Sequence, residues 1–259
     1  MKKFLLVLLA LCLLAVPSFA HELTIKAHSN EIHKNVPFNV TVQSAHKFIV
    51  PEEVEVISRV KAGIFENGKF IESELTPDEK NLCINFTVTP KDDSQSIILV
   101  AIKDGETWSI TNQGGKSDSR KNLEAQGLKV LRATKNDKYA KAIFNTSEND
   151  KNFSTVLNHP LEIIPVTNPA NAKVGDFFEV KILLNGQPYT GPVWATYDGF
   201  VTEYENTYAY YTEAENGKAF IKITAPGWWG IRAFQNDLPG VEGDYDNLTL
   251  RAFLLFEVK

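Results

Sequence analysis

Two histidines, His21 and His46, have the side chains and positions in this sequence that best suit metal chemistry. His21 follows Ser18-Phe19-Ala20, a small-x-small pattern typical of signal-peptide cleavage. Cleavage after Ala20 makes His21 the first residue, with a free α-amine beside ring Nδ1. Both nitrogens can then chelate one metal ion, because an amine with a pKa near ~7.7–8.0 releases its proton readily. We therefore predict a metal site formed by His21 and completed by His46.

The residues before His21 have the pattern of an export signal. Lys2 and Lys3 are followed by an apolar run from Phe4 to Val16. The run is shorter than the ~20 residues of a membrane-spanning helix. We predict that residues 1–20 are a cleaved signal peptide and that the mature protein is periplasmic, with no direct insertion into the membrane.

Alternating apolar residues predict that two neighbouring strands position the histidines. Leu23 to Ala27 and Val36 to Val42 each alternate between apolar and polar side chains, as half-buried strands do. A short loop between such strands favours antiparallel pairing. Pairing of Ala27 with Val36 places His21 near Val42 or Gln43, and His46 can then fold back over His21.

The rest of the chain predicts an all-β protein. Short strands follow each other at ~8–12 residue spacing with tight Asn-Gly turns, and helical periodicity is absent. We predict two immunoglobulin-like β-sandwich domains joined by a polar linker. The N-terminal sandwich covers residues 21–148 and carries the metal site, the linker covers 149–160, and the C-terminal sandwich covers 161–259.

Charge and cysteine content exclude several classes of function. The formal net charge is −5, and it becomes −7 without Lys2 and Lys3, which argues against nucleic acid or an anionic membrane as a partner. Only Cys83 remains after cleavage, so no internal disulfide can form. Its apolar neighbours indicate a buried small side chain rather than a metal ligand.

Other candidate residues have simpler interpretations. His28 and His33 lie at the far end of the predicted hairpin, as surface histidines or a second, looser site, and His159 precedes Pro160 as a structural residue. Asn152 lies in an acidic-extended glycosylation pattern whose use the sequence does not decide. Four acidic residues form a solvated loop or a hard-cation site: Asp237, Glu242, Asp244 and Asp246. Five aromatic residues are expected in the core or on a sheet face, with a flat sugar platform as the alternative: Tyr208, Tyr210, Tyr211, Trp228 and Trp229.

Catalytic motifs are absent from the sequence. Gly114-Gly115-Lys116-Ser117 is similar to a phosphate loop, but Ile110 stands where the first glycine is needed. No nucleophile elbow, zinc-protease motif or cysteine pair occurs. We therefore expect a protein that is not an enzyme.

The motifs along the chain, in their order and spacing, resemble those of one family. They are His21-Glu22-Leu23, Ala45-His46-Lys47-Phe48, Lys138-Tyr139-Ala140-Lys141-Ala142, Leu161-Glu162-Ile163-Ile164-Pro165, Val174-Gly175-Asp176, Asn185-Gly186-Gln187-Pro188, Ala195-Thr196-Tyr197 and Gly227-Trp228-Trp229. The chain resembles secreted bacterial proteins with a nickel/cobalt-uptake-type periplasmic domain (NikM-like), formerly a domain of unknown function. The resemblance covers the whole mature chain. It implies two sandwich domains and a role in transition-metal handling.

One position departs from the family pattern. Gln235 stands where many relatives carry another histidine, which places the metal site within the first domain. The metal is Ni, Co or Cu. The resemblance implies nickel or cobalt, whereas the three nitrogens that His21 and His46 supply favour Cu(II) or Ni(II). By affinity alone copper binds more tightly than nickel, so the ligands do not identify the physiological metal.

These features predict a periplasmic divalent-metal-binding protein of the nickel/cobalt class. It acts as an accessory or substrate-binding component of metal uptake and passes its ion to an inner-membrane metal transporter. Two alternatives remain open. One is a copper histidine-brace oxidative enzyme, and the other is a structural or adhesive tandem β-sandwich with incidental histidines.

Overall fold

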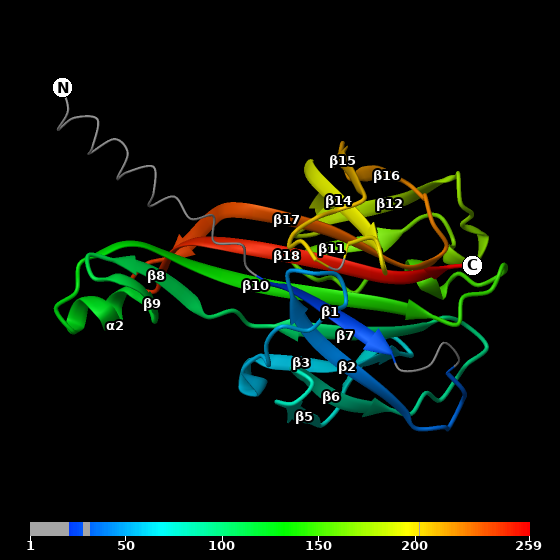
Figure 1. Ribbon diagram of the computed structural model, residues 1–259, viewed down its shortest axis with the longest axis horizontal. Coiled ribbons are helices and arrows are strands. Elements are labelled where there is room, and N and C mark those ends of the chain that lie inside the picture. The colour runs from blue at the N-terminus through cyan, green and yellow to red at the C-terminus, as the bar shows by residue number, and fades with distance from the viewer. Residues whose placement is uncertain (1–20, 28–31, 202) are drawn as a thin grey trace.

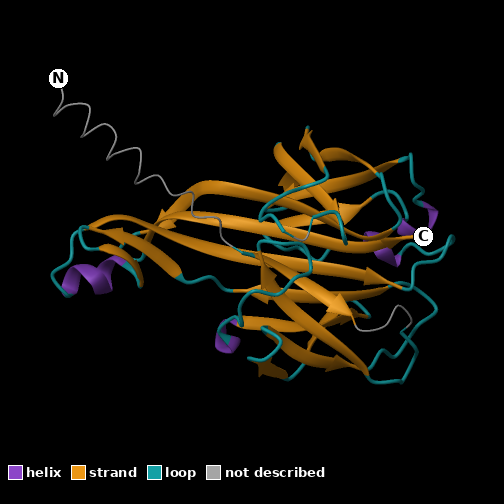
Figure 2. Ribbon diagram, viewed as in Figure 1, coloured by secondary structure: helices purple, strands orange, loops and turns teal. Residues whose placement is uncertain are grey.

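The computed structural model describes residues 21–27, 32–201 and 203–259 (Figures 1 and 2). The predicted signal peptide, its cleavage after Ala20, and His28 lie outside these residues. Strands dominate the described chain, and they form three sheets that pack into two sandwiches. The predicted all-β sandwich fold is confirmed.

The first sheet forms one wall of the N-terminal sandwich and contains both strands that lead to the candidate histidines. Its order is β1-β2-β6-β5, and all its pairings are antiparallel. Its strands are β1 (Glu22–Ala27), β2 (Phe38–Ala45), β6 (Cys83–Val88) and β5 (Leu75–Asp78). Apolar residues alternate along β2, where Val40 and Val42 are buried in the core, as the sequence pattern predicts.

A ten-stranded sheet runs through both halves of the molecule. Its main order is β15-β14-β17-β18-β10-β7-β3-β4, and β8 and β9 extend it beside β10. The strands are β3 (Val60–Glu66), β4 (Lys69–Glu72), β7 (Ile97–Lys103), β8 (Thr107–Thr111), β9 (Gly114–Ser117), β10 (Val130–Phe144), β14 (Gly191–Tyr197), β15 (Tyr210–Ala214), β17 (Gly227–Val241) and β18 (Tyr245–Val258). β10 pairs with β18 in parallel, so the two sandwiches share one continuous sheet.

The third sheet covers the C-terminal half of the large sheet. It contains β11 (Leu161–Pro165), β12 (Phe177–Leu184), β13 (Gln187–Pro188) and β16 (Lys218–Lys222). The helical segments are short: η1 (Ile57–Arg59), α2 (Arg120–Ala125), η2 (Asn152–Ser154) and η3 (Pro169–Asn171). α2 lies with β8 and β9 at the end of an arm that extends from the sandwiches (Figure 1). Among the described residues, no helix has the length and apolar character needed to cross a membrane.

β10 contributes one face to each of the two cores. Ala140 and Ala142 lie in the N-terminal core, whereas Tyr139 and Ile143 lie in or against the C-terminal core. A strand buried on both faces has no solvent-facing side for its polar residues. Lys138 on the N-terminal face and Lys141 on the C-terminal face therefore each need a buried carboxylate partner.

The segment between the predicted domains packs against the large sheet. Asp150 is buried and accepts a hydrogen bond from the backbone N–H of Ser96 (2.7 Å), and the Asn152 amide donates to the Ser96 carbonyl (2.6 Å). Lys141, on the C-terminal face of β10, forms a buried ion pair with Glu162 of β11 (2.5 Å). The backbone N–H of Leu157 also donates to Glu162 Oε1 (2.8 Å), so the segment is tied to both halves, and its boundaries at residues 149–160 stay a prediction.

Candidate metal centre

The pairing of β1 with β2 brings His21 and His46 together. Glu22 lies opposite Ala45 and Ala27 opposite Val40, so His21 and His46 face each other one position beyond the paired strands. Their ring centroids are 3.9 Å apart. The convergence of the two histidines occurs as the sequence suggested, but Val42 and Gln43 do not lie opposite His21.

The difference in register follows from the residue at which β2 begins. The sequence pattern predicts a strand that begins at Val36. In the structure Val36 is half exposed, and β2 begins at Phe38. The backbone N–H of Asn35 donates to the carbonyl of Pro90 (2.8 Å), and the backbone N–H of Val36 donates to the carbonyl of His33 (3.2 Å). These two hydrogen bonds hold the stretch in a turn. The hairpin connection is therefore longer, and every pairing moves toward the C-terminal end of β2.

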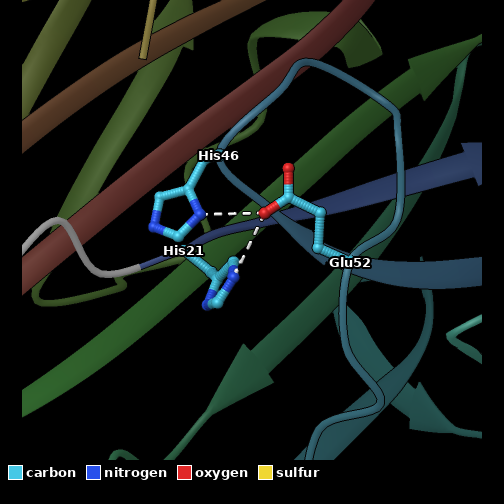
Figure 3. Close-up of side chains that lie close together, drawn as sticks. All are labelled: His21, His46 and Glu52. Atoms are coloured by element: carbon cyan, nitrogen blue, oxygen red, sulfur yellow. Dashed lines mark hydrogen bonds and ion pairs between the residues drawn. The ribbon is translucent and has the colours of Figure 1, made fainter. Parts of the chain in front are cut away.

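Glu52 is a third potential ligand, and it comes from the loop after β2. Its backbone N–H donates to the carbonyl of Ser44 (3.0 Å), which folds the loop back onto the strand end. Glu52 Oε2 lies 2.8 Å from His46 Nδ1 and 3.3 Å from His21 Nε2. Figure 3 shows both rings pointing to this one carboxylate oxygen. One ligand atom from each of the three residues lies within 4.8 Å of the others, which is close enough to share one ion.

The carboxylates beside the histidines are held in their charged form. Burial works to raise the pKa of the Glu52 carboxyl, but hydrogen bonds from His46 and the nearby His21 ring bring it below its ordinary value. A hydrogen bond from His21 lowers the pKa of Glu53 in the same way. Glu52 Oε1 is buried and makes no protein hydrogen bond in the described chain, so it is available to a ligand.

A buried ion cluster lies directly behind the carboxylates. The Glu55 carboxylate contacts Lys138 Nζ at 3.1 Å and forms an ion pair with Lys103, while the Ser44 hydroxyl donates to it at 2.8 Å. Burial works to raise the pKa of Glu55, but the two ammonium groups outweigh it and lower the pKa to about 2. Lys138 is the first residue of the Lys138-Tyr139-Ala140-Lys141-Ala142 motif, and it anchors the loop after β2 through Glu55.

On the opposite side of β1, the C-terminal half holds the neighbour of His21. Glu22 Oε1 lies 2.7 Å from Arg232 Nε, as an ion pair, and 2.7 Å from Arg251 Nη1, which donates a hydrogen bond. The backbone N–H of Asn206 donates to the carbonyl of His46 (3.0 Å). Residues of β17, β18 and the loop before β15 therefore fix the backbone on which both histidines stand.

The other candidate ligands are not brought to this centre. His33 is exposed near the opposite end of β2, and the ring of His159 packs against Tyr139 at 5.2 Å between centroids. Cys83 is buried, as predicted. Two of the four acidic candidates lie in strands rather than in a loop, and they form ion pairs: Asp237 of β17 with Arg132, and Asp246 of β18 with Arg120.

The polar and aromatic candidates of the sequence have structural partners. The Asn152 amide is occupied by its bond to Ser96, and its Oδ1 accepts from Thr155 (2.9 Å), so the folded protein does not present it freely to a glycosylating enzyme. Trp229 is fully buried in the C-terminal core, and Trp228 packs on Phe144. Gln235 is only half-buried and its amide donates to the adjacent carbonyl of Asn236.

Sequence reasoning missed Glu52 and Glu53. They lie in the acidic stretch from Pro51 to Glu55 and follow His46 by six and seven positions. A turn that returns the chain to the strand end was the signal that could have identified them. The bridge between Ser44 and Glu53 forms that return.

Comparisons with known proteins identify a family and a distant structural likeness. A family model described as Domain of unknown function (DUF4198) matches residues 18–237. No curated protein matches the chain. Among solved structures, the full ectodomain (Ig1–Ig3) of mouse nectin-like molecule 4 is similar at 11% identity and a TM-score of 0.21, with 92% of this chain covered. The chain spans 65% of the length of that ectodomain.

Proposed function

The chain belongs to the family described as Domain of unknown function (DUF4198), and we propose that it is an exported protein that binds a divalent transition metal through His21, His46 and Glu52. The observation that carries the proposal is the convergence of three ligand atoms within 4.8 Å, from a strand end and the loop that folds over it.

The ligand set suits a first-row transition metal. The two imidazole nitrogens favour Ni(II), Co(II) or Cu(II) over the hard cations Mg²⁺ and Ca²⁺, and the carboxylate oxygen is a harder third ligand that these ions also accept. The three residues leave coordination positions open, which water can fill. Affinity alone ranks copper first, so the physiological metal follows from supply and not from this donor set.

The proposed cellular role is that of a periplasmic carrier. The nickel/cobalt-uptake resemblance in the sequence supports an accessory or substrate-binding role in metal uptake, with an inner-membrane metal transporter as partner. The centre is only partly exposed, with side-chain exposures of 24% for His21 and 14% for His46. Such a site can retain an ion in solution and still release it to a partner that approaches the loop.

Metal titration of the processed protein tests this function. We expect isothermal titration with Ni(II), Co(II) and Cu(II) to show one site per chain for at least one of them. His46→Ala and Glu52→Gln should each weaken it more than about 100-fold, beyond the about 10–100-fold typical of residues that only support ligands. His33→Ala is the matched control, because His33 is exposed near the other end of β2. Equal affinity in the wild type and His46→Ala would refute the proposal.

The copper-enzyme alternative uses the same histidine pair and differs in one measurement. The 3.9 Å contact between the His21 and His46 rings is compatible with two histidines on one copper ion. An oxidative enzyme should consume O₂ with ascorbate and cleave a polysaccharide when loaded with copper. The carrier that we propose should bind the metal without such turnover.

A further inference from the structure

We propose that Glu53 is a positioning residue that orients the His21 ring, so that His21 offers Nε2, rather than Nδ1, to the metal. This inference rests on the proposed function, since it concerns how the same centre holds its ion. It departs from the chelate expected from sequence, in which the α-amine and Nδ1 of His21 bind together. The two modes require different orientations of one imidazole ring.

The two nitrogens of His21 face two different carboxylates. Nδ1 lies 2.9 Å from Glu53 Oε1, and Nε2 lies 3.3 Å from Glu52 Oε2. A neutral imidazole carries one N–H, and a carboxylate accepts hydrogen bonds but cannot donate them when ionised. The contact with Glu53 is the shorter of the two, and Glu52 Oε2 already lies 2.8 Å from His46 Nδ1, so the tautomer with the proton on Nδ1 of His21 is favoured. That tautomer leaves the lone pair on Nε2, on the side where His46 and Glu52 lie.

Glu53 is itself held in place by the strand end. Ser44 and Glu53 form a backbone bridge, and the Ser44 hydroxyl lies 3.3 Å from Glu53 Oε1 and 2.8 Å from Glu55 Oε1. Glu55 is in turn fixed by Lys138 and Lys103. A chain of polar contacts thus leads from the ammonium groups of Lys138 and Lys103 to the ring of His21. The successive residues Glu52 and Glu53 point to different nitrogens because their backbone is extended at this bridge.

The arrangement resembles a general feature of metal sites. Histidine ligands commonly donate their second ring N–H to a carboxylate, which fixes the ring and raises the basicity of the ligating nitrogen. An amine and Nδ1 chelate would require the His21 ring to turn and give up Glu53. The position of Glu53 makes that rotation unfavourable, so metal affinity should depend on Glu53 and much less on the α-amine.

Ring tautomers can be measured without any metal. In the processed, metal-free protein with ¹⁵N-labelled histidine, we expect the His21 ring at pH 8 to show a protonated Nδ1 and an unprotonated Nε2. Glu53→Ala should shift the ring toward the opposite tautomer, which predominates in free histidine. Glu79→Ala, at an exposed glutamate away from the centre, should leave the His21 signals unchanged. An Nε2–H tautomer in the wild-type protein would overturn the inference.

Copper(II) supplies the second arm of the test. We expect Glu53→Ala to weaken Cu(II) binding about 10–100-fold and to change the electron paramagnetic resonance spectrum, with Glu53→Asp restoring part of both. One extra residue before His21 should change the affinity less than about 3-fold, because the α-amine is not required. A large loss on extension, with Glu53→Ala without effect, would establish the amine and Nδ1 chelate instead.

The outcomes separate the inference from the proposed function. If the wild type binds Cu(II), Ni(II) and Co(II) no more tightly than His46→Ala, then the metal function fails and the inference fails with it. If the wild type binds more tightly but Glu53→Ala binds equally well, only the role of Glu53 is refuted. Glu53 is 44% exposed, so its removal should leave folding intact, and urea unfolding of each variant checks this.

Discussion

His21 and Glu22 are neighbours in the chain, but their surroundings differ completely. His21 is partly exposed beside His46 and Glu52, with nitrogen and oxygen atoms that can turn to a ligand. Glu22 points to the other side of β1, where it is 5% exposed and lies between Arg232 and Arg251. One position is built to bind, and the next is built to hold the strand in place.

The two clusters also balance their charges differently. The histidine cluster joins two carboxylates, Glu52 and Glu53, to two imidazoles and is open to solvent at the loop. The Glu22 cluster sets two guanidinium groups against one carboxylate, and the surplus positive charge lies against aromatic rings. Arg232 is 5.1 Å from the Trp194 ring centre, and its Nη1 donates to the Tyr208 hydroxyl at 3.0 Å. Buried charges contribute to stability only while every partner is present.

The largest effect that we expect is from Glu22→Ala. The substitution leaves two buried guanidinium groups without their carboxylate, which typically costs about 3–5 kcal/mol of unfolding free energy. Glu53→Ala is the control on the other face and should cost at most about 1 kcal/mol, because Glu53 is almost half exposed. Urea unfolding followed by tryptophan fluorescence measures both. Equal losses would mean that the contrast between the two faces is wrong.

Acid should weaken the anchor behind the metal centre next. The folded-state pKa of Glu55 is about 2, below its ordinary value of 4.5, because Lys138 and Lys103 outweigh its burial. A depressed carboxyl pKa gives stability that is fully present above pH 4.5 and is lost as the pH falls toward 2. The shift corresponds to about 3 kcal/mol. Glu55→Gln should therefore lose stability at neutral pH and flatten the decline between pH 4.5 and 2.

Measurement of unfolding free energies across this range tests the assignment to Glu55. Glu74→Gln provides a control, because Glu74 is exposed and not part of the Glu55 cluster. A Glu55→Gln profile as steep as that of the wild type would assign the acid transition to other carboxylates.

The sequence predicts the fold well because the physical signals are local. Alternation in Leu23 to Ala27 and the spacing of short strands are enough to predict sandwiches, and both histidines lie at strand ends that antiparallel pairing brings together. The register was wrong by several residues because it depends on where β2 begins. That point is set by a contact between Asn35 and Pro90, which are far apart in sequence.

Long-range charge pairing is the part that sequence reasoning could not supply. Glu22 meets Arg251 across 229 positions, and no local pattern marks either residue as buried. The position of β10 between the two cores also could not be predicted from local pattern, because its parallel pairing with β18 joins segments that are distant in sequence. Glu52 was visible as an acidic residue, but only the folded loop shows that its oxygen reaches two imidazoles.

A third histidine, His159, lies in surroundings that differ from those of the metal centre. We expect its effect on the unfolding free energy to be the smallest of those predicted here. The ring of His159 packs on Tyr139, and burial lowers its pKa from 6.5 to about 4, with Glu162 opposing the shift and Lys141 adding to it. A depressed pKa means that stability is complete above pH 6.5 and declines as the pH falls toward 4. Because the residue is still partly exposed, we expect this contribution to be about 1 kcal/mol. In unfolding free energies measured across this pH range, His159→Phe should remove that part of the decline. His33→Phe, at an exposed site, is the control and should leave the pH profile unchanged. The opposite pattern would mean that the titrating histidine is not His159.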